Sequence, residues 1–422
     1  MVQLLQDYPA ALKWIDMKKL VYLIGVLGMA VSCTAGGIFS GEKAGMILDG
    51  MASSDRGLMP GESEGQGGGE AGVLTAGEWN DLQNWDFWGK LMTTPAQEGD
   101  DGQGTADYGK MAADWGFNTA HRIAVKVKQE DGTPAANVKV ELLKGGAPVW
   151  TTCTANDGSA QLWHDLFSAK GQETPTDGLQ LRIGGVLQSG TPEVCSYTSA
   201  PVNEYTVSVA APASKADVAF IVDATGSMGD EIAFLKKDLL SILKKVQQSQ
   251  AGVEIRTGAV FYRDEGDLFL TRVDNFTTPA STMSFIGKQA AEGGGDLPEA
   301  VHSALEAGLQ KLSWNASARA RIAFLILDAP AHIDHDGVVM NLQNSIRSYA
   351  AQGIRIVPVV ASTGDKTTEF MCRDFAIVTG GTYVFLTDDS GVGESHLIPT
   401  VGDYEIEKLN DLLYRLLDSY IR

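Results

Sequence analysis

The stretch Val218–Met228 reads VAFIVDATGSM, an apolar run that closes on an aspartate, a threonine and a serine at alternate positions. Apolar runs of this kind are typical of parallel strands that are buried on both faces of a sheet. Three similar runs follow along the chain, IAFLIL at 322–327, IRIVPVV at 354–360 and TYVFL at 382–386. Pro358 is expected near a strand end or a bulge, because proline cannot donate a hydrogen bond inside a central strand.

Helical patterns separate the apolar runs. Residues 231–248 carry apolar side chains at helix spacing, and the end of the chain repeats that spacing. These side chains are Ile232, Leu235, Leu239, Ile242, Leu243 and Val246 in the first segment and Ile406, Leu409, Leu413, Leu416 and Tyr420 in the second. Alternating strands and helices predict a doubly wound α/β sheet. Residues 253–273 instead hold two strand-like runs around a tight acidic turn, which predicts a hairpin at an antiparallel edge.

Oxygen-bearing side chains follow the first strand directly. Asp223, Thr225 and Ser227 alternate along one sharp loop, and Asp328 closes the strand at 322–327. Open α/β sheets bind ligands at the carboxyl ends of their strands, so these side chains are expected to meet at that edge. A carboxylate with hydroxyl oxygens is a suitable ligand set for a hard cation such as Mg²⁺. The sequence therefore predicts a cation site there.

Three motifs in the second half of the chain point to a known family. IVDATGSM resembles the DxSxS metal-ion-dependent adhesion motif of von Willebrand factor type A domains, and EGGGDLPEA and LILDAPAH are similar to later loops of that family, in the same order. The resemblance covers residues 215–422 and implies a Rossmann-like domain. It implies that Asp223, Thr225 and Ser227 ligate Mg²⁺, or Mn²⁺ or Ca²⁺, directly or through water, with Asp328 in the outer shell. An acidic side chain of a protein partner often completes the coordination in that family.

The second of these loops departs from the family pattern. The family usually supplies a threonine there, whereas this chain offers Asp296, with Glu299 as a less favoured substitute. A further carboxylate would tighten cation binding. It would also weaken the attraction of the metal for an anionic partner, because the local charge is closer to neutral before the partner arrives.

Further polar residues are expected around this edge as a rim that selects the ligand. They are Asp264, Asp267, Asp388, Ser390 and His396. Taken singly, each is more often a solvated loop end. His332 and His335 have a spacing that would suit zinc on a helix, but Pro330 and Gly337 predict a loop, so zinc is the less favoured interpretation.

Residues 121–211 follow a different pattern, in which apolar and polar side chains alternate between short turns. This pattern predicts an antiparallel β-sandwich. The order of DGTP, VKVELL and NDGSAQLW resembles small modules of the carboxypeptidase-regulatory and bacterial immunoglobulin-like kind, which implies a spacer or binding module. Cys153 and Cys195 both lie in this segment and are expected to form a disulfide. Cys372 lies in a helical pattern and is expected to be a buried, inert thiol.

Residues 1–33 have the pattern of an export signal. A basic patch precedes an apolar run that is too short to span a membrane comfortably. The end of this run resembles a bacterial lipobox, which implies that Cys33 carries a lipid and anchors the chain to a membrane; an ordinary cleaved signal is the alternative. Met17 is expected to be the true start, because residues 1–16 do not look like a signal peptide.

Two segments lie between the signal and the predicted sandwich. Residues 34–73 are rich in Gly, Ser and Glu without apolar periodicity, which predicts a disordered tether. Residues 74–120 hold a cluster of aromatic side chains before a second polar stretch. The cluster comprises Trp79, Trp85, Phe87 and Trp88. It is either an aromatic ligand platform, for instance for sugars, or a segment that docks its aromatics against the next domain, and docking is favoured.

The net charge of the chain bears on the class of partner that it can bind. The 422 residues include 33 Lys and Arg and 53 Asp and Glu, a net charge of −20, which repels polyphosphates and disfavours nucleic acid as a partner.

The sequence favours a non-catalytic, metal-dependent protein-binding lipoprotein of the bacterial outer membrane or cell surface. One alternative is a metal-dependent phosphoryl-transfer hydrolase with Asp223 as nucleophile, disfavoured because Thr225 stands where such phosphatases usually have an acid. Another is a structural envelope protein with a stabilising metal.

Overall fold

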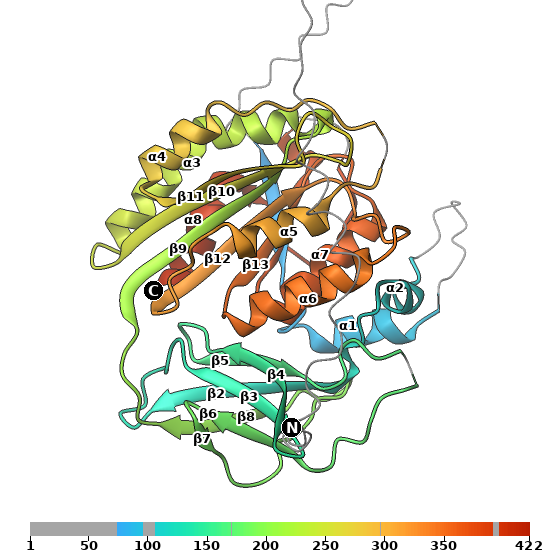
Figure 1. The fold of residues 1–422 in the computed structure, drawn as a ribbon, viewed down its shortest axis with the longest axis vertical. Coiled ribbons are helices and arrows are strands. Elements are labelled where there is room, and N and C mark those ends of the chain that lie inside the picture. The colour runs from blue at the N-terminus through green and yellow to red at the C-terminus, as the bar shows by residue number, and fades with distance from the viewer. Residues whose placement is uncertain (1–73, 96–105, 170, 296, 391–395) are drawn as a thin grey trace, which may run out of the picture. The chain divides into compact units, whose positions relative to one another are not determined.

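The computed structural model describes residues 74–95, 106–169, 171–295, 297–390 and 396–422 (Figure 1). The expectations for the export signal, Cys33, the tether and Asp296 concern positions outside these described residues. Among the helices in the described ranges, none is both long and apolar enough to cross a membrane.

An eight-stranded mixed sheet forms the centre of the described chain (Figure 1). Its strand order is β11-β10-β9-β12-β13-β14-β1-β15, and the five strands from β10 to β14 in this order run parallel. The strands are β1 (Thr75–Trp79), β9 (Ala213–Asp223), β10 (Glu254–Tyr262), β11 (Thr271–Thr277), β12 (Ala318–Leu327), β13 (Arg355–Val360), β14 (Tyr383–Thr387) and β15 (Glu407–Lys408). The chain passes from β9 to β10 on one side and later to β12 on the other. Strand β9 is therefore the point at which the topology reverses, where such sheets open a crevice.

Two details of the sheet bear on the sequence predictions. Strands β10 and β11 form the predicted antiparallel hairpin, and β11 is the edge strand. Pro358 lies inside β13 instead of at its end, and it is opposite Leu325 of β12. The pairing of β13 with β14 begins only at Val359, so the proline precedes the hydrogen-bond ladder on that side.

Helices cover both faces of the large sheet (Figure 1). One face packs against α3 (Gly229–Ser249), α4 (Pro279–Ile286) and α8 (Leu409–Ile421), and the other against α5 (Val301–Gln310), α6 (Val338–Ala351) and α7 (Lys366–Thr379). Strand β9 serves both cores, because Val218 and Phe220 face the first layer while Ala219 and Ile221 face the second. Burial on both faces explains the continuous apolar run, and each such large side chain contributes roughly 1.5–3 kcal/mol.

The helix predictions hold with one correction. All six apolar side chains predicted for residues 231–248 are buried in α3. Ile406, by contrast, is 45% exposed and precedes α8, because Glu407 and Lys408 are taken up by the short strand β15 beside β1. Cys372 is fully buried in α7, as predicted, and burial raises the pKa of its thiol well above the usual value.

Two smaller sheets follow the first helices. One has the order β5-β2-β8 and the other β4-β3-β6-β7. Their strands are β2 (Arg122–Gln129), β3 (Lys139–Lys144), β4 (Ala147–Cys153), β5 (Ser159–Trp163), β6 (Leu179–Ile183), β7 (Val186–Leu187) and β8 (Val202–Val207). Side chains of both sheets share one apolar core, but the predicted antiparallel pairing holds only in part, because β2 pairs with β8 in parallel. Gly158 lies in the turn before β5 at a φ of 83°, and a Cβ there would lie 2.2 Å from the carbonyl oxygen of Val127.

The structure does not form the predicted disulfide, because Cys153 and Cys195 are both free thiols. Cys153 ends β4, and its Sγ lies 3.9 Å from the carbonyl oxygen of Ala351 in α6. The Sγ of Cys195 lies 3.6 Å from the carbonyl oxygen of Pro201, and its backbone NH donates to Arg122 of β2. The two cysteines thus lie beside different sheets and face different neighbours.

The aromatic segment is part of the hydrophobic core. It contributes β1 to the large sheet, followed by α1 (Trp85–Thr93) and α2 (Tyr108–Trp115). Trp79, Trp85 and Trp88 are buried; Trp85 packs near Trp163, and Trp88 stacks on Phe370 of α7. The aromatics therefore dock, as favoured, and they do so against the large sheet's helices as well as the smaller sheets. A ligand platform would require exposed rings.

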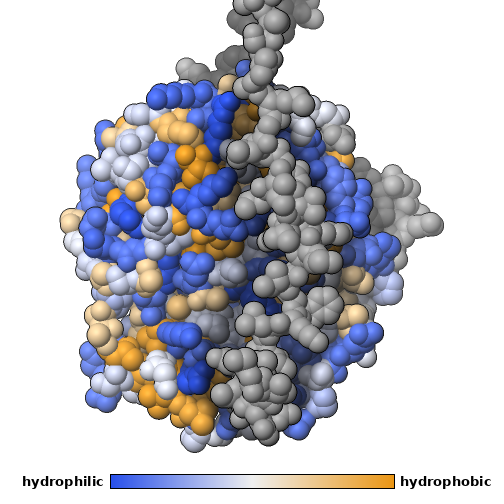
Figure 2. All heavy atoms as spheres, in the orientation of Figure 1, coloured by the Kyte–Doolittle hydropathy of each residue, from blue (hydrophilic) through white to orange (hydrophobic). Residues whose placement is uncertain are grey.

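On the face drawn in Figure 2, blue hydrophilic residues interleave with smaller orange groups, one of which lies over β6 and β7 at the lower left. Exposed apolar residues in that part of the chain include Val186, Leu187 and Val202.

Candidate metal-binding site

The loop after β9 carries the predicted ligands at the carboxyl edge of the sheet. Asp223 is fully buried, and its Oδ1 accepts hydrogen bonds from the backbone NH (2.9 Å) and the hydroxyl (2.8 Å) of Thr225. The short 3-10 helix η3 (Gly226–Met228) follows, in which Ser227 is exposed. The loop is thus held close to the start of α3, where backbone NH groups favour negative charge.

The loop between α4 and α5 closes over this turn. The backbone NH of Gly226 donates to the carbonyl oxygen of Gly293 (3.1 Å), and that of Gly294 donates to Asp267 (3.0 Å). A Cβ at Gly294, whose φ is 72°, would lie 3.1 Å from the Cβ of Thr225 and 3.3 Å from Oε1 of Glu299. A side chain at this position would therefore crowd the site. Asp296, the predicted ligand of this loop, lies outside the described residues.

Glu299 is the carboxylate that the structure places in the site from this loop. It is buried, and its backbone NH donates to the carbonyl oxygen of Pro330 (2.8 Å), which ties it to the loop that follows β12. The sequence offered it only as a less favoured substitute for the usual threonine. Asp328 arrives from the end of β12 as predicted, and the hydroxyl of Thr363 donates to its Oδ2 at 3.2 Å.

Two of the predicted rim residues lie in the same cluster. Asp264 and Asp267 follow β10, which runs parallel to β9 as expected. The charges of both act on Glu299. Asp264 is buried with its Oδ1 2.8 Å from Nε2 of His332. The structure therefore brings Asp223, Thr225, Asp264, Asp267 and Asp328 to one edge, with Glu299 among them.

The clustering of carboxylates shifts the pKa values of the groups at this edge. Burial, together with the charge of Asp328, raises the pKa of Asp223 to about 7 against the lowering effect of the Thr225 hydrogen bonds. Burial and the charges of the neighbouring aspartates raise the pKa of Glu299 to about 9. Burial and the same carboxylates also raise the pKa of Tyr262 well above its usual value. Among the described residues, no lysine or arginine is paired with Asp223, Asp264, Asp267 or Glu299.

This donor set fits a divalent cation. Oδ2 of Asp223 and Oε2 of Glu299 are buried and lack a hydrogen-bond partner, and the hydroxyl of Tyr262 interacts with Asp223 without hydrogen-bond geometry. Buried carboxylate oxygens are normally paired, hydrogen-bonded or bound to metal. Hard oxygen donors in this number are the ligands that Mg²⁺, Mn²⁺ and Ca²⁺ prefer.

The remaining rim residues form a second, adjoining group. Nδ1 of His396 lies 2.7 Å from Oδ1 of Asp388, and its Nε2 lies 3.1 Å from Oγ of Ser362. The hydroxyl of Ser362 also lies 3.2 Å from Oε1 of the buried Glu231, in the first turn of α3. Asp388 and Ser390 belong to the 3-10 helix η4 (Asp388–Ser390), and the side chain of Ser390 lies outside the described part of the structure. His396 and Asp388 are thus brought together, and Ser362 was not predicted.

His332 and His335 lie in a loop, as Pro330 and Gly337 predicted, and their rings stack with centroids 4.4 Å apart. With Asp334 they form a group whose possible ligand atoms lie within 4.8 Å of one another. His332 is already engaged with Asp264 through Nε2, which links this loop to the carboxylate cluster.

Three contributors to the site escaped the sequence predictions. Tyr262 is the last residue of a predicted strand, and its position there predicts a core side chain. Glu231 has the position of an acidic residue that stabilises the first turn of a helix, which is common. Ser362 follows the apolar run at 354–360 and so stands at the carboxyl edge, a signal that was available.

Residues 217–387 match the family model of the von Willebrand factor A domain. This part of the chain is therefore a von Willebrand factor A domain, and the mixed central sheet fits the Rossmann-like fold that the resemblance implied.

Two curated relatives match this chain over part of their length. The alpha-protein kinase vwkA of Dictyostelium discoideum is 30% identical over 119 residues, 28% of this chain and 19% of the kinase. An ariadne-like RING finger protein of Acanthamoeba polyphaga mimivirus is 27% identical over 186 residues, 40% of this chain and 18% of that protein. The chain thus spans less than a fifth of the length of these curated relatives.

Solved structures show more distant likeness. Proximal thread matrix protein 1 of the mussel byssus has 13% identity and a TM-score of 0.32, over 49% of this chain and 45% of that one. The pilus adhesin SpaC of Lactobacillus rhamnosus GG has 12% identity and a TM-score of 0.33, over 50% of this chain and 30% of that one. At these values neither structure informs the function of this chain.

Proposed function

We propose that this chain is a non-catalytic, metal-dependent adhesion protein that binds a protein ligand at the carboxyl edge of its von Willebrand factor A domain. Domains of this family commonly bind proteins. Asp223, Thr225 and Ser227 would hold Mg²⁺, or Mn²⁺ or Ca²⁺, with Asp328 in the outer shell and Glu299 or Asp296 from the second loop. The bound ion would supply a Lewis-acidic position for an oxygen of the partner's acidic side chain.

The observation that supports this function most is the buried carboxylate cluster. Asp223 is fully buried, Glu299 nearly so, and one oxygen of each lacks a hydrogen-bond partner. Bringing such groups together in the ionised state is unfavourable without a compensating cation. A divalent ion would offset this repulsion at neutral pH.

Apolar side chains around the cluster favour a protein as the ligand. Leu268 follows Asp267 and is 81% exposed; Leu297 lies two residues before Glu299 and is 63% exposed; Ile398 lies two residues after His396 and is 78% exposed. Exposed large apolar residues beside a polar centre are typical of protein-binding surfaces. They distinguish this edge from a site for a small ion alone.

Calorimetric titration of the full chain with Mg²⁺ and Mn²⁺ tests the metal site. Asp223→Asn keeps the shape of the side chain and removes its charge, so we expect the affinity to fall about 100-fold or more, whereas the exposed control Asp411→Asn should bind like the parent chain. Asp296→Ala tests whether that residue is a ligand. Equal titrations of the parent chain and Asp223→Asn would exclude the proposed site.

Capture from an envelope extract tests the protein ligand. The full chain is used as bait with Mg²⁺, with a chelator, and with Mg²⁺ restored, and Asp223→Asn serves as the matched bait. We expect specific partners to be lost with the chelator and with the variant, and to return with Mg²⁺. If the same proteins are captured with the chelator and with Asp223→Asn, a structural role is favoured. Metal-dependent turnover in a phosphate-ester screen would favour the hydrolase.

We further propose that the chain is exported and held at the bacterial cell envelope by a lipid on Cys33. In this arrangement, residues 121–211 form an immunoglobulin-like or carboxypeptidase-regulatory-like sandwich that acts as a spacer. Labelling of cells with a clickable fatty acid tests the anchor, with Cys33→Ala as the control. Absence of label, or label that survives Cys33→Ala, would exclude lipidation at this residue.

A further inference from the structure

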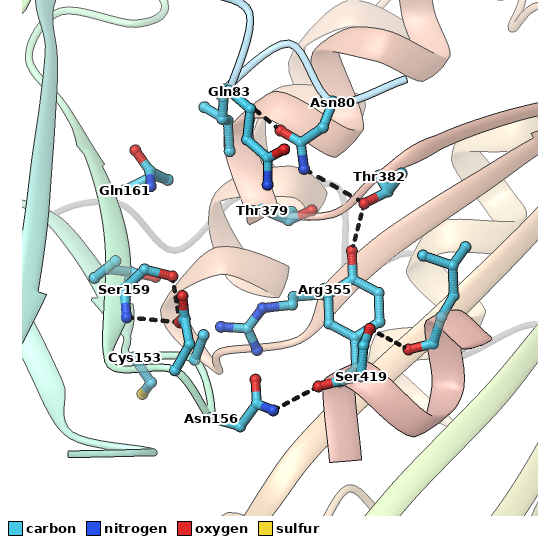
Figure 3. Close-up of a pocket in the computed structure, with 18 of the residues that line it drawn as sticks. Asn80, Gln83, Cys153, Asn156, Ser159, Gln161, Arg355, Thr379, Thr382 and Ser419 are labelled. Carbon is cyan, nitrogen blue, oxygen red and sulfur yellow. Dashed lines mark hydrogen bonds between the residues drawn. The ribbon is translucent and has the colours of Figure 1, made fainter. Parts of the chain in front are cut away.

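A cavity of about 440 Å³ lies between the large sheet and the smaller sheets (Figure 3). Strand β13 begins at Arg355 and β1 ends at Trp79 on this side, so the cavity lies at the amino edge of the parallel strands. The carboxylate cluster lies at the opposite edge. The turn between β4 and β5 forms the other wall. A volume in this range suits a small-molecule ligand.

Arg355 contributes a positive charge to the cavity. It is only 7% exposed, and its guanidinium points into the cavity (Figure 3). It makes no hydrogen bond and no salt bridge to any residue that the structure describes. Burial lowers the pKa of the guanidinium, which remains charged. Asp157 also lines the cavity, and its charge acts on the guanidinium without a hydrogen bond or salt bridge, so the donors of Arg355 remain available to a bound anion.

A second arginine adds to the positive charge. Arg122 donates to Oε1 of Gln161 (2.8 Å) and to the carbonyl oxygen of Leu82 (3.2 Å), which are both neutral acceptors. Its guanidinium lies over the ring of Trp85, and burial lowers its pKa to about 10. The cavity therefore contains two arginines without a carboxylate partner among the described residues, in a chain of net charge −20.

The acidic residues that line the cavity do not neutralise these arginines by direct pairing. Glu78 is paired with Arg415 (3.0 Å), and Asp157 with Lys126 (3.0 Å). The cavity thus holds an excess of positive charge that its own carboxylates leave unpaired.

Neutral polar groups complete the lining. Asn80, Gln83, Ser159 and Gln161 line the same cavity as Arg355 (Figure 3). We propose that the cavity binds a small anionic molecule whose carboxylate or phosphate group is held by Arg355, with these amide and hydroxyl groups binding its polar remainder. The planar guanidinium can bind either oxyanion through two parallel hydrogen bonds. The cavity is separate from the metal site, because the two lie at opposite edges of the sheet.

Titration of the full chain with inorganic phosphate and, separately, with propionate tests the proposal, with calorimetry and thermal unfolding as readouts. Chloride replaces the oxyanion at equal ionic strength in the reference. We expect binding of at least one oxyanion, and the comparison tells whether phosphate or carboxylate is preferred. Arg355→Gln should weaken that binding about 10- to 100-fold, because a charge-assisted pair of hydrogen bonds is lost.

The matched control is Arg347→Gln. This arginine lies over Trp150 and Phe167, outside the cavity lining, so its removal changes the net charge equally without touching the site. The control should bind like the parent chain. No binding of either oxyanion to the parent chain, or equal binding by Arg355→Gln, would overturn the proposal.

Alkylation of Cys153 gives a readout that needs no variant. Cys153 is half-buried and belongs to the lining of the same cavity, with its Sγ turned toward α6, whereas Cys372 is fully buried elsewhere and reports unfolding. An oxyanion that occupies about 90% of the sites should slow alkylation of Cys153 in the parent chain about tenfold, because only the empty fraction reacts. Unchanged alkylation of Cys153 at saturating phosphate and propionate would overturn the proposal even if Arg355→Gln fails to fold.

Discussion

Asp374 is a residue whose burial makes the stability of the chain depend on pH. It lies in α7, is fully buried, and neither carboxylate oxygen has a hydrogen-bond partner. Burial, with the nearby charge of Asp81, raises its pKa well above the usual value, against the opposing effect of Arg373. The folded state therefore favours the neutral acid, and this contribution to stability is present at low pH and lost as pH rises through the raised pKa.

Asp374→Asn stays neutral at every pH and so isolates this effect. Above the unfolded pKa of about 4, the parent chain should lose stability relative to the variant by up to about 1.4 kcal/mol per pH unit, until the folded pKa is reached. Urea unfolding of both chains at pH 5 and pH 8 measures the difference. A free-energy difference that is the same at both pH values would contradict the expectation.

Ser362, His396 and Asp388 stand in the order of a hydrolytic triad, yet their surroundings argue against catalysis. Ser362 is only 5% exposed, and its hydroxyl is shared between His396 and Glu231. We expect a fluorophosphonate probe to leave Ser362 unlabelled, as measured by peptide mass spectrometry on the folded chain. Labelling that Ser362→Ala abolishes would instead assign a nucleophile to this group.

Sequence reasoning at the residue scale succeeded where the chemistry is local. Asp223 and Thr225 share one turn, and Asp328 directly ends an apolar run, so their common edge followed from strand direction alone. Glu299 could not be ranked above Asp296, because both lie in a glycine-rich loop whose path depends on contacts with Thr225 and Pro330. That Arg355 has no salt bridge could not be predicted, because it depends on which side chains the fold places around it, and the sequence near Arg355 does not show this.

At the scale of elements, β1 is the part that the sequence did not predict. Its five residues pair with β14, more than three hundred positions away, and they carry no continuous apolar run. The buried salt bridge between Asp81 and Arg373 (2.6 Å) fixes the segment that follows it against α7. The parallel strands, by contrast, were predictable because burial on both faces demands apolar residues at every position.

The connection from α7 to β14 tolerates no added side chain. A Cβ at Gly381 would lie 1.8 Å from the carbonyl oxygen of Ile356 in β13. Gly381→Ala should therefore reduce the free energy of unfolding by about 3 kcal/mol or more. The control Gly252→Ala meets open space and should change it by less than about 0.5 kcal/mol. Urea unfolding of both variants checks this, and equal effects would contradict it.

At the scale of the whole molecule, the smaller sheets and the large sheet share one hydrophobic cluster. Asn137 accepts a hydrogen bond from Arg321 (2.5 Å), and the indole NH of Trp163 donates to the carbonyl oxygen of Val378 in α7 (3.4 Å). The sequence predicted separate domains at 121–211 and 215–422 because the hydrophobic periodicity changes between them. Periodicity shows where the type of secondary structure changes, but it does not show how much surface the two parts bury against each other.

The shared core predicts that these parts unfold together. Urea unfolding of the full chain should give coincident transitions by tryptophan fluorescence and far-ultraviolet circular dichroism, and calorimetry should give one main heat-absorption peak. Trp163→Ala, which removes a buried contact between the parts, should lower the midpoint. Two well-separated transitions in the parent chain would show that the parts are energetically independent.

The position of β1 also determines how the domain would respond to tension. Thr75 pairs with Thr387, so the chain enters the large sheet at the same edge that carries the carboxylate cluster. A pull between residue 74 and a ligand held at that edge runs across the strands instead of along them. The hydrogen bonds that β1 makes with β14, and those that Thr75 and Ala76 make with β15, would then be loaded one after another, starting at Thr75, before the end of the strand that carries Trp79 into the core.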